Sequence, residues 1–119
     1  MSADDRLGKI VHLQNELQKM VGVSIEKVES LPMKEKLEVI RSYCLIALSK
    51  INDLAESAGS KWWNLLPNMC EDKVKDDAID VICTAVNLAI ATGMDADEIY
   101  KRFITKNSRN YRKFASKGR

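Results

Sequence analysis

The stretch DDAIDVICTAVNLAIA, residues 76–91, places the strongest constraint on the fold. At the helical period of 3.6 residues, Asp77, Asp80, Thr84 and Asn87 fall on one face, and the remaining faces are almost wholly apolar. A helix that is apolar on most sides needs neighbours on most sides. The stretch therefore predicts the central helix of a bundle, with one polar stripe that begins with two carboxylates.

The rest of the chain predicts further helices and no strand. Only two prolines and five glycines interrupt the sequence, and apolar residues recur at helical spacing in long segments. Asp95 followed by Glu98 forms a capping box, which marks the start of a last helix. Glycine and proline in residues 22–32 and a tryptophan pair in residues 59–72 indicate connecting segments. The fold class is all-α, and the predicted helices span residues 5–21, 33–58, 73–92 and 95–107.

Charge is distributed unevenly along the chain. Residues 101–119 carry eight lysines and arginines and no acid, so this end is +8 and the first hundred residues sum to −6. A basic segment favours a polyanionic partner such as nucleotide phosphates, nucleic acid or an acidic protein. A solvated chain end is the alternative interpretation. We divide the chain into a helical domain, residues 1–107, and a basic C-terminal tail, residues 108–119.

Composition excludes several classes of protein. Three cysteines without CxxC spacing argue against a disulfide scaffold or zinc site, and the single His12 leaves little material for histidine chemistry. No apolar run approaches the roughly 20 residues of a membrane span, and the N-terminus lacks the apolar core of a signal sequence. We expect a cytoplasmic protein without a membrane partner.

Two pairs of carboxylates stand three residues apart. Asp53 and Glu56 lie on the second predicted helix, and Asp77 and Asp80 lie on the third. Packed side by side, these helices would bring the carboxylates together, and such a cluster normally pairs with cations or holds a metal. Oxygen ligands suit Mg²⁺ or Mn²⁺. The alternative is two solvated helix faces, because acids at this spacing are common on helices.

A family resemblance rests on four stretches: LQNELQKMVG, KEKLEVIRSYCLIALSKIND, KWW, and DAIDVICTAVNLAIATGMDADEIYKRFITKNSRN. They resemble the first helix, the second helix, the Lys-x-Trp loop, and the third and fourth helices of the all-α nucleoside triphosphate pyrophosphatases. This is the MazG and dimeric dUTPase superfamily, and a short dUTPase-like subgroup of bacteria and phages is most similar. The match covers roughly residues 9–113. It implies a four-to-five-helix bundle of the MazG and dimeric dUTPase type that forms a homodimer.

The resemblance also implies a reaction. In that family an E-x-x-E and an E-x-x-D motif bind Mg²⁺, and a water then cleaves a nucleoside triphosphate, such as dUTP, to the monophosphate and pyrophosphate. By position, the catalytic and metal-binding carboxylates are Asp53, Asp77 and Asp80, with Glu56 as a further metal ligand one turn away. The residues that match positions around the nucleotide are Gln14, Lys61, Trp63, Asn87, Lys106 and Asn107.

The sequence departs from the family at the metal motif. Lys50 stands where the family has a glutamate, and Asp53 and Asp77 replace glutamates, which shortens each side chain by about 1.5 Å. Magnesium requires near-ideal geometry, so these changes handicap a metal site. Two interpretations remain open. In the first, a relaxed site still binds Mg²⁺ or Mn²⁺. In the second, the Lys50 ammonium substitutes for the metal, and the protein has no cofactor.

Each interpretation predicts a different function. A relaxed site predicts a weak or impaired nucleoside triphosphate pyrophosphatase. A site held by lysine predicts a catalytically inactive homologue that acts as a dimeric protein-interaction module. A third hypothesis is a nucleic-acid-binding helical protein, in which Tyr111 and Phe114 stack on bases between the cations of the tail.

Overall fold

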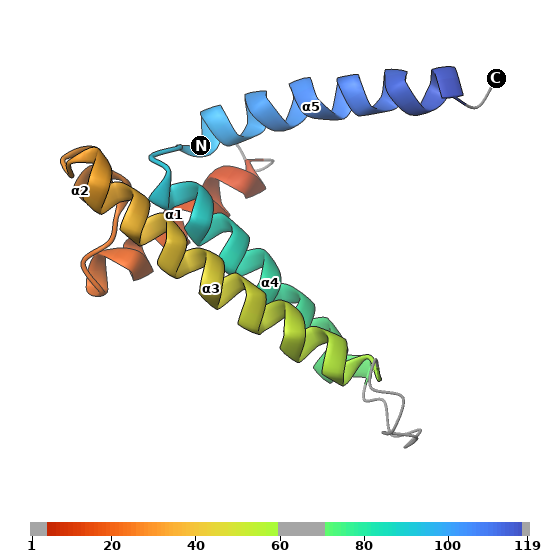
Figure 1. The fold of residues 1–119 in the computed structure, drawn as a ribbon, viewed down its shortest axis with the longest axis horizontal. Coiled ribbons are helices and arrows are strands. Elements are labelled where there is room, and N and C mark those ends of the chain that lie inside the picture. Colours follow the sequence, from red (N-terminus) through yellow and green to blue (C-terminus); the bar gives the residue numbers. More distant parts are fainter. Residues whose placement is uncertain (1–4, 60–70, 118–119) are drawn as a thin grey trace.

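The computed structural model describes residues 5–59 and 71–117, and these residues form helices joined by turns, with no strand among them (Figure 1). The all-α prediction is confirmed for this part of the chain. The predicted connecting segment of residues 59–72 lies mostly outside the described residues. The five helices are α1 (Arg6–Met20), α2 (Ile25–Glu29), α3 (Met33–Ser57), α4 (Glu71–Ala91) and α5 (Ala96–Lys117).

Two elements differ from the sequence prediction. Helix α2 lies in a segment expected to be a connector. It begins where the Ser24 side chain accepts a hydrogen bond from the Lys27 N–H at 3.2 Å, and it is too short to show a helical period. Helix α5 begins as predicted, because Asp95 Oδ1 accepts from the Glu98 N–H at 2.9 Å. The predicted end at Asn107 is wrong, because the sequence offers no helix breaker before residue 118.

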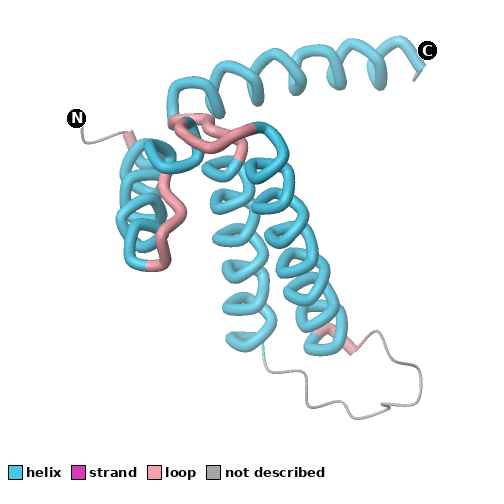
Figure 2. Tube along the Cα trace, turned by 60° about the vertical axis from the view of Figure 1, so that its left-hand side comes forward, coloured by secondary structure: helices cyan, strands magenta, loops and turns pink. Residues whose placement is uncertain are grey.

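The antiparallel pair of α3 and α4 is the main packing unit of the chain, and the two helices lie side by side in both views (Figure 2). The half-buried positions of α4 include Asp77, Val81 and Leu88, with Thr84 fully buried. These residues recur at helical spacing, so they share the face of α4 that meets α3. Asp77 and Thr84 of the polar stripe therefore lie along this contact, whereas Asp80 is exposed.

The fully buried apolar side chains lie where α1 and α2 cover the C-terminal end of α4. Val28 and Ile90 are 0% exposed, and Val11 and Ala91 are also buried. Polar contacts fix this corner. Asn15 of α1 accepts a hydrogen bond from the Ile25 N–H at 2.9 Å, and the Tyr43 hydroxyl of α3 donates to Gln18. Among the described residues, the buried core is thus small and sits at one end of the α3–α4 pair.

A tight turn sends α5 away from the rest of the chain. Gly93 has φ of +89°, which side chains with a Cβ rarely adopt, and its N–H donates to the Ile90 carbonyl at 2.8 Å. The chain bends by 108° between α4 and α5. Helix α5 packs mainly against α1. The Cα radius of gyration is 17.4 Å, whereas a compact chain of this length has about 13.5 Å.

No single helix among the described residues is long and apolar enough to span a membrane. Only α4 and α5 taken together, with the bend between them, meet that criterion of length and composition.

We expect Ile90→Ala to destabilise the protein by about 2–5 kcal/mol, because it opens a cavity in a core with few fully buried side chains. Ile79→Ala is the matched control. It changes the same residue type on the same helix, where the side chain is 54% exposed, and should cost about 0.5 kcal/mol. Urea unfolding of both variants measures the difference. Equal losses of stability would contradict this location of the core.

Candidate functional site

Asp77 is the best protected of the four predicted carboxylates. Its side chain is 13% exposed, and Lys73, one turn earlier on α4, donates to Asp77 Oδ2 at 3.0 Å. This hydrogen bond is the largest cause that lowers the pKa of Asp77 below its ordinary value of 3.8. The Ser57 hydroxyl of α3 and the positive charge of Lys50 also lower this pKa, while burial opposes them.

Asp53 and Asp80 lie near the same lysine, although both are exposed. The Lys73–Asp77 hydrogen bond raises the pKa of Lys73 most, and the charges of Asp53 and Asp80 raise it further. Helices α3 and α4 thus bring one predicted carboxylate, Asp77, into contact with Lys73 and two more, Asp53 and Asp80, within the range of its charge. We call Asp53, Asp77, Asp80, Lys50 and Lys73 the charge cluster.

Sequence reasoning missed Lys73 in this cluster. It assigned the compensating cation to Lys50, which is half-buried on α3 and contributes through its charge. The direct ion pair with Asp77 comes from Lys73 instead. The signal was present in the sequence, because a lysine and an aspartate four residues apart on a helix are neighbours.

The charge cluster does not fit a divalent cation in this arrangement. Within residues 5–59 and 71–117, no three histidine, cysteine, aspartate or glutamate side chains are grouped so that they could hold a metal ion. Asp77 is engaged by Lys73, and exposed Glu56 accepts a hydrogen bond from Asn52 at 3.3 Å. Binding of Mg²⁺ or Mn²⁺ therefore stays a prediction, and it requires these side chains to rearrange.

A hydrogen-bonded pair of amide side chains joins α1 to the polar stripe of α4. Gln14 Nε2 of α1 donates to Asn87 Oδ1 at 2.9 Å, and both side chains are half-buried. Between this pair and the charge cluster, Thr84 is buried and donates its hydroxyl proton to the Asp80 carbonyl at 2.8 Å. Each amide keeps further hydrogen-bond donors and acceptors. These are the groups needed to recognise a base or a sugar.

Of the remaining predicted residues, the two that the structure describes are not brought to this stripe within one chain. Lys61 and Trp63 lie outside the described residues. Lys106 and Asn107 are exposed on α5, which points away from α3 and α4 (Figure 1). Lys106 lines a shallow groove of about 660 Å³ on the polar face of α5. The basic residues that share this groove with it are Lys101, Arg102 and Arg109.

Comparisons with family models, with curated proteins and with solved structures found no match to this chain.

We predict that Lys73→Ala raises the pKa of Asp77 toward 3.8, because it removes the largest cause of the depression. Lys75→Ala is the control, since Lys75 pairs with Glu71 at 3.0 Å and should leave the pKa of Asp77 unchanged. NMR titration of the aspartate carboxyl carbons measures both. An unchanged Asp77 pKa in Lys73→Ala would show that this ion pair does not form in solution.

The same shift sets a pH dependence of stability. A carboxylate whose pKa is lowered by folding stabilises the protein above its unfolded pKa of about 3.9. That contribution is lost as the pH falls through the lower pKa of the folded state. We expect Asp77→Asn to reduce the loss of stability below about pH 4 in thermal melts across this range. A wild type and variant with parallel acid profiles would contradict this role.

Proposed function

We propose that this chain binds nucleoside triphosphates, such as dUTP, as a protein of the MazG and dimeric dUTPase type, and that it hydrolyses them slowly to the monophosphate and pyrophosphate. The observation that carries the proposal is the arrangement along α4. An amide pair from two helices lies at one end of the polar stripe, and the charge cluster lies at the other. A nucleotide has the same two ends, a hydrogen-bonding base and a charged triphosphate.

The residues divide into two groups by chemistry. Gln14 and Asn87 offer amide donors and acceptors to the base or the sugar. Lys50 and Lys73 offer ammonium groups to phosphate oxygens, and a lysine binds phosphate as a point charge. An arriving triphosphate competes with Asp77 for Lys73, so nucleotide binding and release of the Lys73–Asp77 pair are coupled. Because the described carboxylates are not grouped as metal ligands, we expect low turnover.

A catalytically inactive, dimeric protein-interaction module is the second candidate. The observation that favours it is the Lys73–Asp77 pair, which neutralises the best protected carboxylate without a metal. Nucleic-acid binding through the cations of α5 is a third candidate, for which the exposed Tyr111 and Phe114 offer stacking surfaces.

One assay separates these candidates. Purified protein is incubated with a panel of nucleoside triphosphates and Mg²⁺ or Mn²⁺, and both nucleotide binding and pyrophosphate release are measured. Slow pyrophosphate release supports the proposed hydrolase. Absence of nucleotide binding across the panel would overturn it. Tight DNA or RNA binding with a steep salt dependence would favour the nucleic-acid candidate.

Lys50→Glu is the sharpest variant of the charge cluster. It replaces a cation by a carboxylate, so we expect the affinity for Mn²⁺ to rise at least about tenfold, because a positive charge that acts on Asp77 is replaced by a negative one. The same change should lower the melting temperature of the metal-free protein, because it removes a positive charge that favours the ionised Asp77 and adds a negative one. Calorimetric titration with Mn²⁺ and thermal melts measure the two effects.

Lys34→Glu provides the matched control, because it reverses an exposed cation on the same helix. It should change neither Mn²⁺ affinity nor metal-free stability by more than a small amount. Tight Mn²⁺ binding and fast dUTP hydrolysis by the wild type would show that Lys50 does not occupy the metal position.

A further inference from the structure

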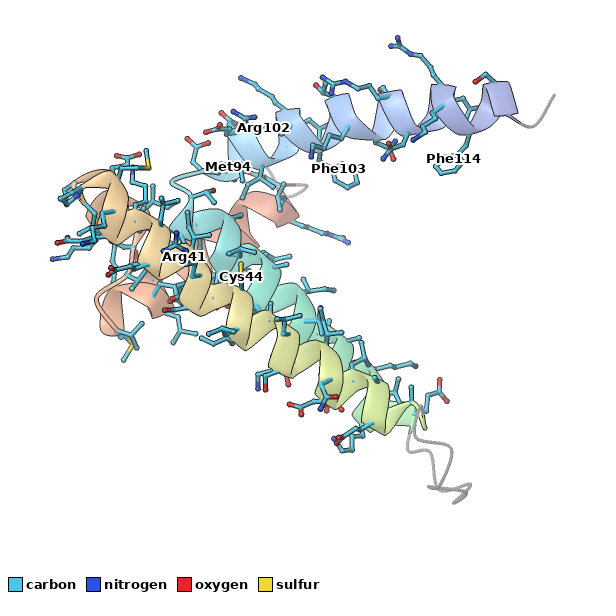
Figure 3. All side chains as sticks on the ribbon, in the orientation of Figure 1. Arg41, Cys44, Met94, Arg102, Phe103 and Phe114 are labelled. Carbon is cyan, nitrogen blue, oxygen red and sulfur yellow. The ribbon has the colours of Figure 1, made fainter. Side chains whose placement is uncertain are left out.

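Helix α5 carries its cations and its large apolar side chains on different sides. By the helical period, Tyr100, Phe103, Ile104, Tyr111 and Phe114 share one side, and Figure 3 shows the two phenylalanines together there. The lysines and arginines between residues 101 and 113 fall on the other half of the helix and are all exposed. We call these six cations the basic face: Lys101, Arg102, Lys106, Arg109, Arg112 and Lys113.

The basic face points away from the rest of the chain. Tyr100, on the apolar side of α5, lines a shallow pocket together with Leu7 of α1, and α1 is the helix against which α5 mainly packs. The apolar side therefore lies toward α1, and the basic face lies toward solvent. Beyond this contact α5 projects away from the other helices in both views (Figure 1, Figure 2). A large partner can therefore approach the basic face without meeting them.

The charge of the basic face is not cancelled along the helix. The two acids of α5, Asp97 and Glu98, lie in its first turn, and no acid follows from residue 99 to its end. Glu98 accepts a hydrogen bond from Arg102 Nε at 2.8 Å, which pairs the cation nearest to the acids. The later turns of α5 therefore present a positive field, and such a field attracts a polyanion.

The dimensions of the basic face suit double-stranded DNA. The face extends about 18 Å from Lys101 to Lys113, at about 1.5 Å per residue. A DNA duplex carries one negative charge per about 1.7 Å, so the same length presents about ten phosphates on its two strands. The major groove of B-DNA is about 12 Å wide and admits an α-helix. The major groove of duplex RNA is too deep and narrow for one.

We propose that the basic face of α5 binds double-stranded DNA in the major groove, mainly through phosphate contacts and without strong sequence preference. A membrane would take up an amphipathic helix by its apolar side, which here lies toward α1. A single strand would stack its bases on Tyr111 and Phe114, on the opposite side of the helix from Arg109. The proposal goes beyond the nucleotide chemistry of α4 and names one ligand for the cations of α5.

Fluorescence anisotropy with a labelled duplex of about 20 base pairs tests the proposal. The wild type should bind with a micromolar dissociation constant at about 50 mM salt. The logarithm of its affinity should fall against the logarithm of salt with a slope of about −4, for four or five contacted phosphates. Arg109→Glu, at the centre of the basic face, should weaken binding at least about tenfold. Lys34→Glu makes the same charge reversal at an exposed position of α3 and should change affinity by no more than about twofold.

A second variant separates phosphate contacts from base stacking. Tyr111→Ala with Phe114→Ala removes the stacking surfaces and leaves the basic face, so duplex affinity should stay within about twofold of the wild type. The wild type should prefer duplex DNA to single-stranded DNA and to duplex RNA of the same sequence. Circular dichroism confirms that each variant keeps its helix content.

Several results would overturn the proposal. These are no duplex binding at about 50 mM salt, equal weakening by Arg109→Glu and Lys34→Glu, or tighter binding of single strands or duplex RNA. Loss of duplex binding in the aromatic double variant would count against it too. So would a wild type that binds phosphatidylcholine–phosphatidylserine vesicles but no duplex. None of the substituted residues belongs to the proposed nucleotide site, so the two proposals fail independently.

Discussion

The packing of α3 against α4 controls the rest of the structure. This contact takes Asp77 and Thr84 of the polar stripe out of open solvent, so that Asp77 is largely protected and Thr84 is buried, while Asp80 stays exposed. A carboxylate in such a position needs a cation or several hydrogen bonds. Lys73, Ser57 and Lys50 meet this need, from both helices of the pair. The charge cluster is therefore a consequence of helix packing as much as a candidate site.

The electrostatics of the cluster bear directly on its chemistry. A metal site needs carboxylates that are free to turn their oxygens to one point. Here the best protected carboxylate already points to Lys73, and its neighbours Asp53 and Asp80 remain exposed. An ion pair within one helix stabilises this resting arrangement and opposes metal entry. The same lysine is available to a phosphate, which explains why the two proposed properties, nucleotide binding and slow turnover, belong together.

The small core has a consequence for assembly. Among the described residues, the fully buried apolar side chains are confined to the end of the α3–α4 pair that α1 and α2 cover. The rest of the described chain, nearly all of α5 included, exposes many of its large apolar side chains. Hydrophobic burial is the main favourable term in folding, so surface of this extent favours association.

The sequence by itself determined the elements and much of their polarity. The bounds of α3 and α4 follow from apolar spacing, and the start of α5 follows from Asp95, because periodicity and capping depend on residues within a few positions of one another. Helix α2 is too short to carry a period. The true end of α5 was missed because polar residues around Asn107 interrupted the pattern without breaking the helix.

Only the tertiary structure decided which side chains meet. The Gln14–Asn87 hydrogen bond joins residues 73 positions apart, and it depends on how α1 is rotated against α4. The charge cluster likewise depends on the rotation of α3, which turns Lys50 and Ser57 toward Asp77. The bend at Gly93 carries Lys106 and Asn107 away from the residues they were predicted to join. Such rotations and bends are set by the packing of whole helices, which local sequence patterns do not encode.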